Sequence, residues 1–435
     1  MKIITRINLT IAIAFSLFLI NTSYAQEEGP SSRLEIEEII VTGTKRDIGQ
    51  QDAAIAVSAI TEQAFANQNA NDPRAIASLV PNVTLTLQPA FNAVAGGIRG
   101  TGSISILVTE DPSVAFLVDD FGLNHVQSQF IEMFDIEQIE VYRGPQGTLF
   151  GKNATGGVIS VTTKKPVLDE WSGEFSAMAG QYDWNEGSIN KFKLALNAPI
   201  VEGKIAMRVA AIWDKSQGFY TNSKPAGDFP GPIVLNPAAA WPDDGTSLSN
   251  VGDGGDLGGK DVLAAKVKLL FEPNASYSGH LIFEISKDDS GSPPTVNETD
   301  CPGGQLFCLL GFPGIHTPSP NWGGEKWSNP YATGESYHCN SVISICKGHR
   351  MDSKGIYFNQ TFAIGDNYTL KSITGYRNHE ERNASTYTGE AFASLYDASR
   401  NTERDQMQQE FRLTSEFDGP FNFTAGVSYA EDNLN

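Results

Sequence analysis

Glycines crowd one short stretch of the chain in a pattern that could serve phosphate binding. The segment IEVYRGPQGTLFGKNATGGVISVTTKKP (139–166) holds five glycines between two strand-like runs. A phosphate-binding loop needs a glycine five residues before its Gly-Lys pair and Ser or Thr after it. Gln146 and Asn153 stand at those two positions. The segment is therefore not a nucleotide site, and the glycines need a structural explanation.

Two acidic groupings resemble catalytic sets but lack the required geometry. Asp119 and Asp120 are adjacent, and neighbouring residues of a strand point to opposite faces, so they cannot act as a dyad. The run His379-Glu380-Glu381 lacks the spacing of the H-E-x-x-H zinc motif. We predict no catalytic residue, no metal site and no cofactor. An exported hydrolase stays as an alternative, which would need two carboxylates about 5 to 9.5 Å apart.

All four cysteines, at positions 301, 308, 339 and 346, lie in one polar segment as two equally spaced pairs. In an exported protein this pattern predicts two disulfides that staple a loop. Three pairings are open, and we favour Cys301–Cys308 with Cys339–Cys346 because these closures are short. A zinc site is the alternative, but the tight C-x₂-C spacing is missing.

The first 25 residues have the layout of a secretory signal peptide. Lys2 and Arg6 precede the apolar run LTIAIAFSLFLI (9–20), and Ser23-Tyr24-Ala25 provides small residues for cleavage. The run is too short for a membrane-spanning helix, which needs about 20 residues. The sequence therefore predicts export.

The composition narrows the class of protein. The net charge is −20, only 19% of the residues are charged, and 42 of 435 are glycine. An acidic chain is a poor partner for nucleic acid, whose phosphates require a basic surface. Short strand-like runs, 10% aromatic residues and many turn residues predict a mainly β fold.

From about residue 167 onward, apolar and polar residues alternate in successive runs. In IAMRVAAIW (205–213) one face is apolar and the other carries Arg208, and KDVLAAKVKLLFE (260–272) repeats the pattern. Short turns alternate with long polar connections at roughly 217–259, 289–353 and 384–401. Long loops at one end and short turns at the other are typical of an outer-membrane β-barrel. We count about nine or ten strands and assign 167–435 to the barrel.

Three segments between residues 51 and 166 resemble the plug of TonB-dependent outer-membrane receptors of Gram-negative bacteria. They are GGIRGTGS (96–103), VAFLVDDF (114–121) and FDIEQIEVYRGPQGTLFGKNATGGVISVTTKKP (134–166). The resemblance implies a 22-stranded barrel filled by an α/β plug, located in the cell outer membrane. Its motif residues here are Gly97, Arg99, Gly100, Arg143, Gly144, Pro145, Gly147, Gly151, Gly156 and Gly157. We expect the chain to be the N-terminal part of such a receptor.

The resemblance also explains the glycines as turns that link plug strands inside the barrel. Glycine allows positive φ and a close backbone approach where a side chain would clash. Arg99 and Arg143 would then face an enclosed lumen and need carboxylate partners, since a buried unpaired charge is costly. Inward residues such as Glu284 and Glu410 are candidates, and contact with trapped water is the alternative.

A short apolar island, Glu38-Ile39-Ile40-Val41-Thr42, resembles the family's TonB box. It stands in a polar, flexible periplasmic segment, 26–50. An extended, β-branched segment can add as a strand to the sheet edge of a partner. The resemblance implies that these residues bind TonB, with its inner-membrane energising complex. A first strand of the plug is the alternative interpretation.

These expectations imply energy-coupled import of a scarce, large small-molecule or metal-chelate substrate, with a ferric siderophore first. Import of haem, cobalamin or oligosaccharide is an alternative, and so is surface recognition or adhesion through the loop 289–353. Lipid and TonB are the expected partners, and nucleic acid is not. Aromatic and histidine side chains in the loops do not identify a substrate site, which stays unassigned (Trp241, Trp322, Trp327, His316, His338).

Overall fold

The structure is a computed structural model, and it describes part of the chain. Described are residues 40–42, 45–46, 48–68, 72–88, 93–103, 107–129, 131–182, 187–217, 220–222, 256–257, 259–290, 328–329, 349–386 and 397–435. All of them belong to one compact unit, residues 39–435. Several predictions fall outside the described residues, namely the signal peptide, Glu38, Ile39, the four cysteines, and the loop residues Trp241, Trp322, Trp327, His316 and His338.

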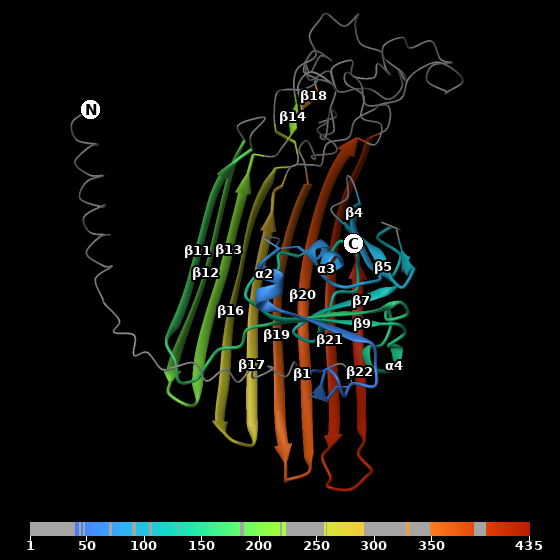
Figure 1. The fold of residues 1–435 in the computed structure, drawn as a ribbon, viewed down its shortest axis with the longest axis vertical. Helices are drawn as coiled ribbons and strands as arrows, with labels where there is room; N and C mark the ends of the chain where they lie inside the picture. The colour runs from blue at the N-terminus through green and yellow to red at the C-terminus, as the bar shows by residue number, and fades with distance from the viewer. Residues whose placement is uncertain are drawn as a thin grey trace, which may run out of the picture. The chain divides into compact units, whose positions relative to one another are not determined.

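Nine long strands form a single antiparallel sheet in which every strand pairs with its sequence neighbours (Figure 1). The strands are β11 (Ser172–Gln181), β12 (Ser188–Val201), β13 (Ile205–Ser216), β16 (Lys260–Asn274), β17 (Tyr277–Asp288), β19 (His349–Ile364), β20 (Tyr368–Thr386), β21 (Asp397–Ser415) and β22 (Thr424–Leu434). They are 10 to 19 residues long. A tilted strand of about 9 to 11 residues crosses a bilayer, so each is long enough.

The two faces of this sheet are inverted relative to a soluble protein. On β16, Lys268 is fully buried and Lys266 is 6% exposed, whereas Leu263 and Phe271 are 49% and 43% exposed. On β13, the alternation buries Arg208 and exposes Trp213. Large apolar side chains on the outer face suit contact with lipid, and charged side chains suit a lumen that holds protein and water. The predicted barrel alternation is confirmed.

The preceding residues form the plug, in several small sheets and three short helices. Its elements are β1 (Ile40–Val41), β2 (Ile48–Gly49), β3 (Val57–Thr61), α2 (Glu62–Ala66), α3 (Arg74–Leu79), β4 (Val83–Gln88), β5 (Ala93–Ile98), β6 (Thr101–Ser103), β7 (Val114–Val118), β8 (Phe121–Gly122), β9 (Ile136–Arg143), α4 (Gly147–Phe150) and β10 (Gly157–Thr163). The central sheet has the order β3-β9-β10-β7-β8, with β10 and β7 parallel. Three further short strands pair with one another: β14 (Tyr220–Asn222), β15 (Asp256–Leu257) and β18 (Ser328–Asn329).

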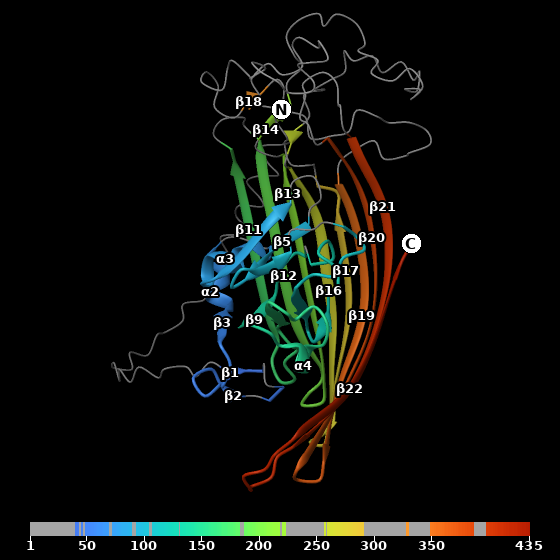
Figure 2. The same cartoon turned by 90° about the vertical axis from the view of Figure 1, so that its right-hand side faces the viewer.

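The plug packs against the inner face of the long sheet, which curves around it (Figure 2). Strand β7 is buried along its whole length because it lies inside the central sheet. The main apolar cluster of the plug also contains Ile282 and Tyr357, which belong to β17 and β19. The plug and the sheet therefore share one core. Within the described residues, no helix is both long and apolar enough to span a membrane.

Candidate functional site

The predicted TonB-binding segment is described for its last three residues, and these lie on the plug. Ile40 and Val41 form β1 and pair with Gly49 and Ile48 of β2. Val41 is fully buried in an apolar cluster, while Ile40 is 52% exposed. For these residues the structure shows the alternative interpretation, a short strand packed on the plug, because the β-branched Val41 has an apolar site to fill. Binding to TonB stays a prediction.

A buried carboxylate, Glu140 of β9, holds this segment. The backbone N–H of Thr42 donates to Glu140 Oε1 at 2.9 Å and the Thr42 hydroxyl donates to Oε2 at 3.0 Å. Gln138 and Tyr142 also donate to the same carboxylate. Burial and the neighbouring Glu140 charge raise the pKa of Tyr142, so its hydroxyl remains a donor. We call Glu140 with Thr42 the latch.

The glycine motifs lie where the backbone makes tight approaches. A Cβ on Gly156 would stand 2.6 Å from the carbonyl oxygen of Thr101, and Gly144 has φ +106°, in the region that favours glycine. Gly97, Gly100, Gly151 and Gly157 occupy similar turns or close approaches. The chain reverses between β9 and β10, which pair antiparallel. The short helix α4, which begins at Gly147 after Pro145, was not predicted.

The two motif arginines do not pair with the carboxylates that the sequence suggested. Glu284 binds Lys266 and Arg377, because Lys266 is its direct cross-strand partner. Glu410 pairs with Arg412, two residues away on its own strand. Arg99 is exposed, in a positive-φ turn. Arg143 Nε is buried without a hydrogen-bond partner among the described residues. The suggested partners were wrong because cations of the sheet itself lie closer to both carboxylates.

Asp119 and Asp120 lie in a turn, whereas the sequence pattern predicted that both lie on a strand. Both have positive φ, 49° and 70°, and form the turn between β7 and β8. Asp119 accepts hydrogen bonds from the Thr163 backbone N–H and hydroxyl. Asp120 lies 3.9 Å from Lys45. Each carboxylate has its own partner within the plug.

A buried ionic contact between the plug and the barrel strands was not predicted. Asp135 lies just before β9 and its side chain is 2% exposed. Arg208 of β13 donates to it from Nε and Nη2 at 2.5 to 3.1 Å, and Lys268 Nζ of β16 lies at 2.9 Å. Burial alone would raise the pKa of Asp135, but the hydrogen bonds from Arg208 and the Lys268 charge outweigh it and lower that pKa. The alternation of apolar and polar residues predicted that Arg208 points inward. Its partner on the plug could not be predicted, because that pairing depends on the tertiary fold.

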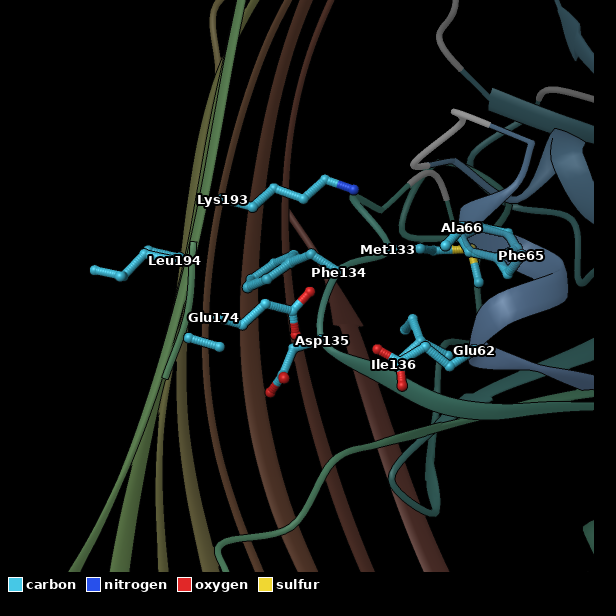
Figure 3. A pocket seen from close by; sticks show the side chains of 12 residues that line it. Glu62, Phe65, Ala66, Met133, Phe134, Asp135, Ile136, Glu174, Lys193 and Leu194 are labelled. Atoms are coloured by element: carbon cyan, nitrogen blue, oxygen red, sulfur yellow. The ribbon is translucent and has the colours of Figure 1, made fainter. Parts of the chain in front are cut away.

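The residues next to Asp135 extend this contact. Phe134 packs in a socket of three alanines and Ile212 on β12, β13 and β16 (Ala195, Ala210, Ile212, Ala264). Figure 3 shows its ring between the strands and the plug, near Lys193. Glu132 binds Lys260 of β16 at 3.2 Å. The cavity beside Phe134 measures about 90 Å³, far below the size of usual small-molecule sites of about 300 to 1,000 Å³. We call residues 132–135 the anchor segment.

A second contact joins the β7–β8 turn to the opposite part of the sheet. Gln408 of β21 accepts from the Gly122 N–H at 2.9 Å and donates to the Asp120 carbonyl at 3.2 Å. Gln406 donates to the Gly122 carbonyl, and Asn359 of β19 donates to the Asp119 carbonyl at 2.9 Å. These hydrogen bonds are all uncharged. We call residues 119–122 the turn contact.

Comparison with known proteins agrees with this architecture. Residues 49–158 match the TonB-dependent Receptor Plug Domain. Residues 49–158 therefore form a plug domain of the TonB-dependent receptor type. The TonB-dependent receptor family is one of transport receptors, and its members are outer-membrane β-barrel proteins of Gram-negative bacteria, which confirms the predicted fold class and localisation.

Several similar proteins are named as receptors for iron chelates, and another is a vitamin B12 transporter of Vibrio vulnificus. The ferric enterobactin receptor of Pseudomonas aeruginosa is 28% identical over 237 residues, which cover 49% of this chain and 31% of the relative. Among solved structures, the ferric yersiniabactin uptake receptor of Yersinia pestis has a TM-score of 0.59 at 16% identity. The ferripyoverdine receptor of Pseudomonas aeruginosa has a TM-score of 0.61 at 13% identity. These alignments cover 87% and 91% of this chain but 49% and 44% of the solved chains.

Proposed function

We propose that the protein imports a ferric siderophore across the outer membrane by energy-coupled rearrangement of its plug. The observation that carries this proposal is the plug packed against a lipid-facing β-sheet, with charges of both partners paired at the interface. A plug in that position closes the lumen, so passage of a large substrate requires the plug to rearrange. Import of this kind transforms nothing chemically, and we assign the chain no enzymatic role.

Residues 38–42 are the proposed attachment point for TonB. The described part, Ile40 to Thr42, is held by only a two-residue pairing with β2 and by the latch. Such a short pairing is easily exchanged for a longer one, in which the segment adds to an exposed strand edge of TonB. The exposed Ile40 faces away from the plug core and is available to the partner in the docked state.

The choice of a ferric siderophore rests on the relatives' substrates, and no substrate-contacting residue is assigned. The test is uptake of radioactive iron as a siderophore complex by iron-starved cells, with and without TonB. We expect TonB-dependent uptake that disappears when the gene for this protein is deleted. Uptake unaffected by that deletion would reject a siderophore cargo.

The same cells distinguish the other proposals. TonB-dependent uptake of haem, cobalamin or an oligosaccharide, in place of the iron chelate, would keep the import mechanism and change its cargo.

Ile40→Pro provides the test of the TonB segment, because proline removes a backbone donor and cannot extend the hydrogen-bonded ladder of a β-sheet. Ile60→Val, a mild change in the plug core, controls for general damage to the plug. Normal transport by the proline variant would reject the assignment.

A further inference from the structure

The sheet carries two positive charges side by side where the anchor segment meets it. Arg208 of β13 and Lys268 of β16 are direct cross-strand partners, and both point inward. Like charges placed directly opposite one another destabilise a strand pair. Asp135 of the plug lies between them and binds both. The Asp135 carboxylate therefore offsets the like-charge repulsion between Arg208 and Lys268.

We propose that the anchor segment, residues 132–135, is the fixed point of the plug on the barrel wall, and that the plug yields at the turn contact, residues 119–122. Withdrawing Asp135 would leave two cations facing each other, and withdrawing Phe134 would empty its alanine socket. Separation of the turn contact breaks uncharged hydrogen bonds, whose backbone and amide groups water can replace, together with the packing of Phe121 on Tyr357. Among the described residues it parts no ion pair between the plug and the sheet, because Asp120 pairs with Lys45 of the plug. The assignment predicts the side of the plug on which a path for the substrate opens. That consequence rests on the proposed import function.

Open space alone does not distinguish the two sides of the plug. A cavity of about 500 Å³ adjoins the turn contact and is lined by Gly122 and Gln408, among others. A cavity of about 510 Å³ lies near Arg208 at the other side. Room to move is therefore similar, and the difference lies in the groups that must be parted.

The latch residue Glu140 lies on β9, the strand that directly follows the anchor segment, which gives the fixed point a mechanical role. Glu140, which holds Thr42, is five residues after Asp135, along β9. A pull on residues 40–42 is transmitted by Glu140 to β9, and the anchor segment resists it at the start of that strand. The plug would then deform around β9 and release β7–β8, which lies at the other edge of the central sheet.

The first test joins each contact with a reducible thiol cross-linker in the receptor in its outer membrane. One variant carries Glu132→Cys with Lys260→Cys across the anchor segment, and the other carries Gly122→Cys with Gln408→Cys across the turn contact. Receptor without engineered cysteines, treated alike, controls for the natural ones. We expect the first cross-link to leave uptake intact. The second should reduce uptake to the level of cells lacking TonB, and reduction should restore it. Block by the first cross-link, or normal uptake with the second, would overturn the proposal.

A second test does not depend on transport. Hydrogen exchange of the β9 amides is compared for the receptor, Asp135→Asn and Glu62→Gln. The Glu62–Lys164 ion pair is as short as that of Asp135 with Arg208, 2.5 Å, but Glu62 is 48% exposed. We expect Asp135→Asn to speed exchange by more than about 100-fold, as for a lost buried partner, and Glu62→Gln to leave it unchanged. Equal exchange rates in the two variants would overturn the proposal that residues 132–135 fix the plug. If exchange is faster in Asp135→Asn alone but the receptor shows no uptake, only the proposed import function is rejected.

Discussion

The anchor segment and the turn contact both join the plug to the barrel wall, but with different groups. The anchor segment uses charges and an aromatic ring, and its central carboxylate serves two cations of adjacent strands. The turn contact uses glutamine and asparagine side chains that bind backbone groups, with Phe121 packed on Tyr357. A plug with these two kinds of contact can be held firmly on one side and remain releasable on the other.

The largest effect should follow loss of the anchor charge. Asp135→Asn removes the carboxylate that binds both Arg208 and Lys268, so we expect a loss of about 3 to 5 kcal/mol in plug stability. Urea titration of plug opening, followed by hydrogen exchange, measures this loss. Adding Lys268→Met to Asp135→Asn should recover part of it, since the repulsion is then removed. No recovery would contradict the like-charge explanation.

A smaller effect is expected at the latch. Glu140→Gln removes the charge that accepts two hydrogen bonds from Thr42, and hydrogen bonds to charged groups contribute about 1.5 to 3 kcal/mol. Proteolysis within residues 40–46 should become faster, while the exchange of amides near Asp135 should not change. Glu137→Gln, on the same strand but exposed, is the matched control. Equal proteolysis in the two variants would show that Glu140 does not hold the segment.

The turn contact can be strained by a single methyl group. A Cβ on Gly375 of β20 would overlap the ring of Phe121, so Gly375→Ala should cost about 1 to 3 kcal/mol through overpacking. Gly180→Ala is the control, because its Cβ would stand 3.9 Å from the nearest side chain. Thermal unfolding of the plug compares the two. If both variants unfold alike, Phe121 does not occupy a tight socket.

Acid should weaken the anchor by protonating Asp135. The pKa of Asp135 is lowered in the folded protein, so its contribution is present above the unfolded value of about 3.9 and is lost as pH falls through the folded value. Glu132 behaves oppositely: burial raises its pKa despite the Lys260 charge, so its ionisation opposes folding as pH rises above about 4.5. Measuring plug stability between pH 2 and 6 for the receptor and for Asp135→Asn isolates the contribution of Asp135. If the stability of both proteins falls equally with decreasing pH, this contribution is absent.

The sequence predicted the local features of the fold well because they depend on local pattern. The alternation of apolar and polar residues on β13 and β16 predicted the lipid-facing side of the sheet. The glycine-rich segment 139–166 predicted a chain reversal within the plug. The anchor segment was missed for a physical reason. Which inward cation meets Asp135 depends on strand register and on packing over 73 and 133 residues of chain, and no local pattern carries that information. The same limit explains the wrong partners suggested for Arg99 and Arg143.

The most direct test of the account is a double-mutant cycle between Asp135 and Arg208, set beside the cycle between Glu62 and Lys164. Plug stability is measured for Asp135→Asn, Arg208→Gln and the double variant. We predict a coupling free energy above about 1.5 kcal/mol for the anchor pair and below about 1 kcal/mol for the exposed pair. Equal coupling in the two cycles would contradict the claim that residues 132–135 fix the plug to the barrel wall.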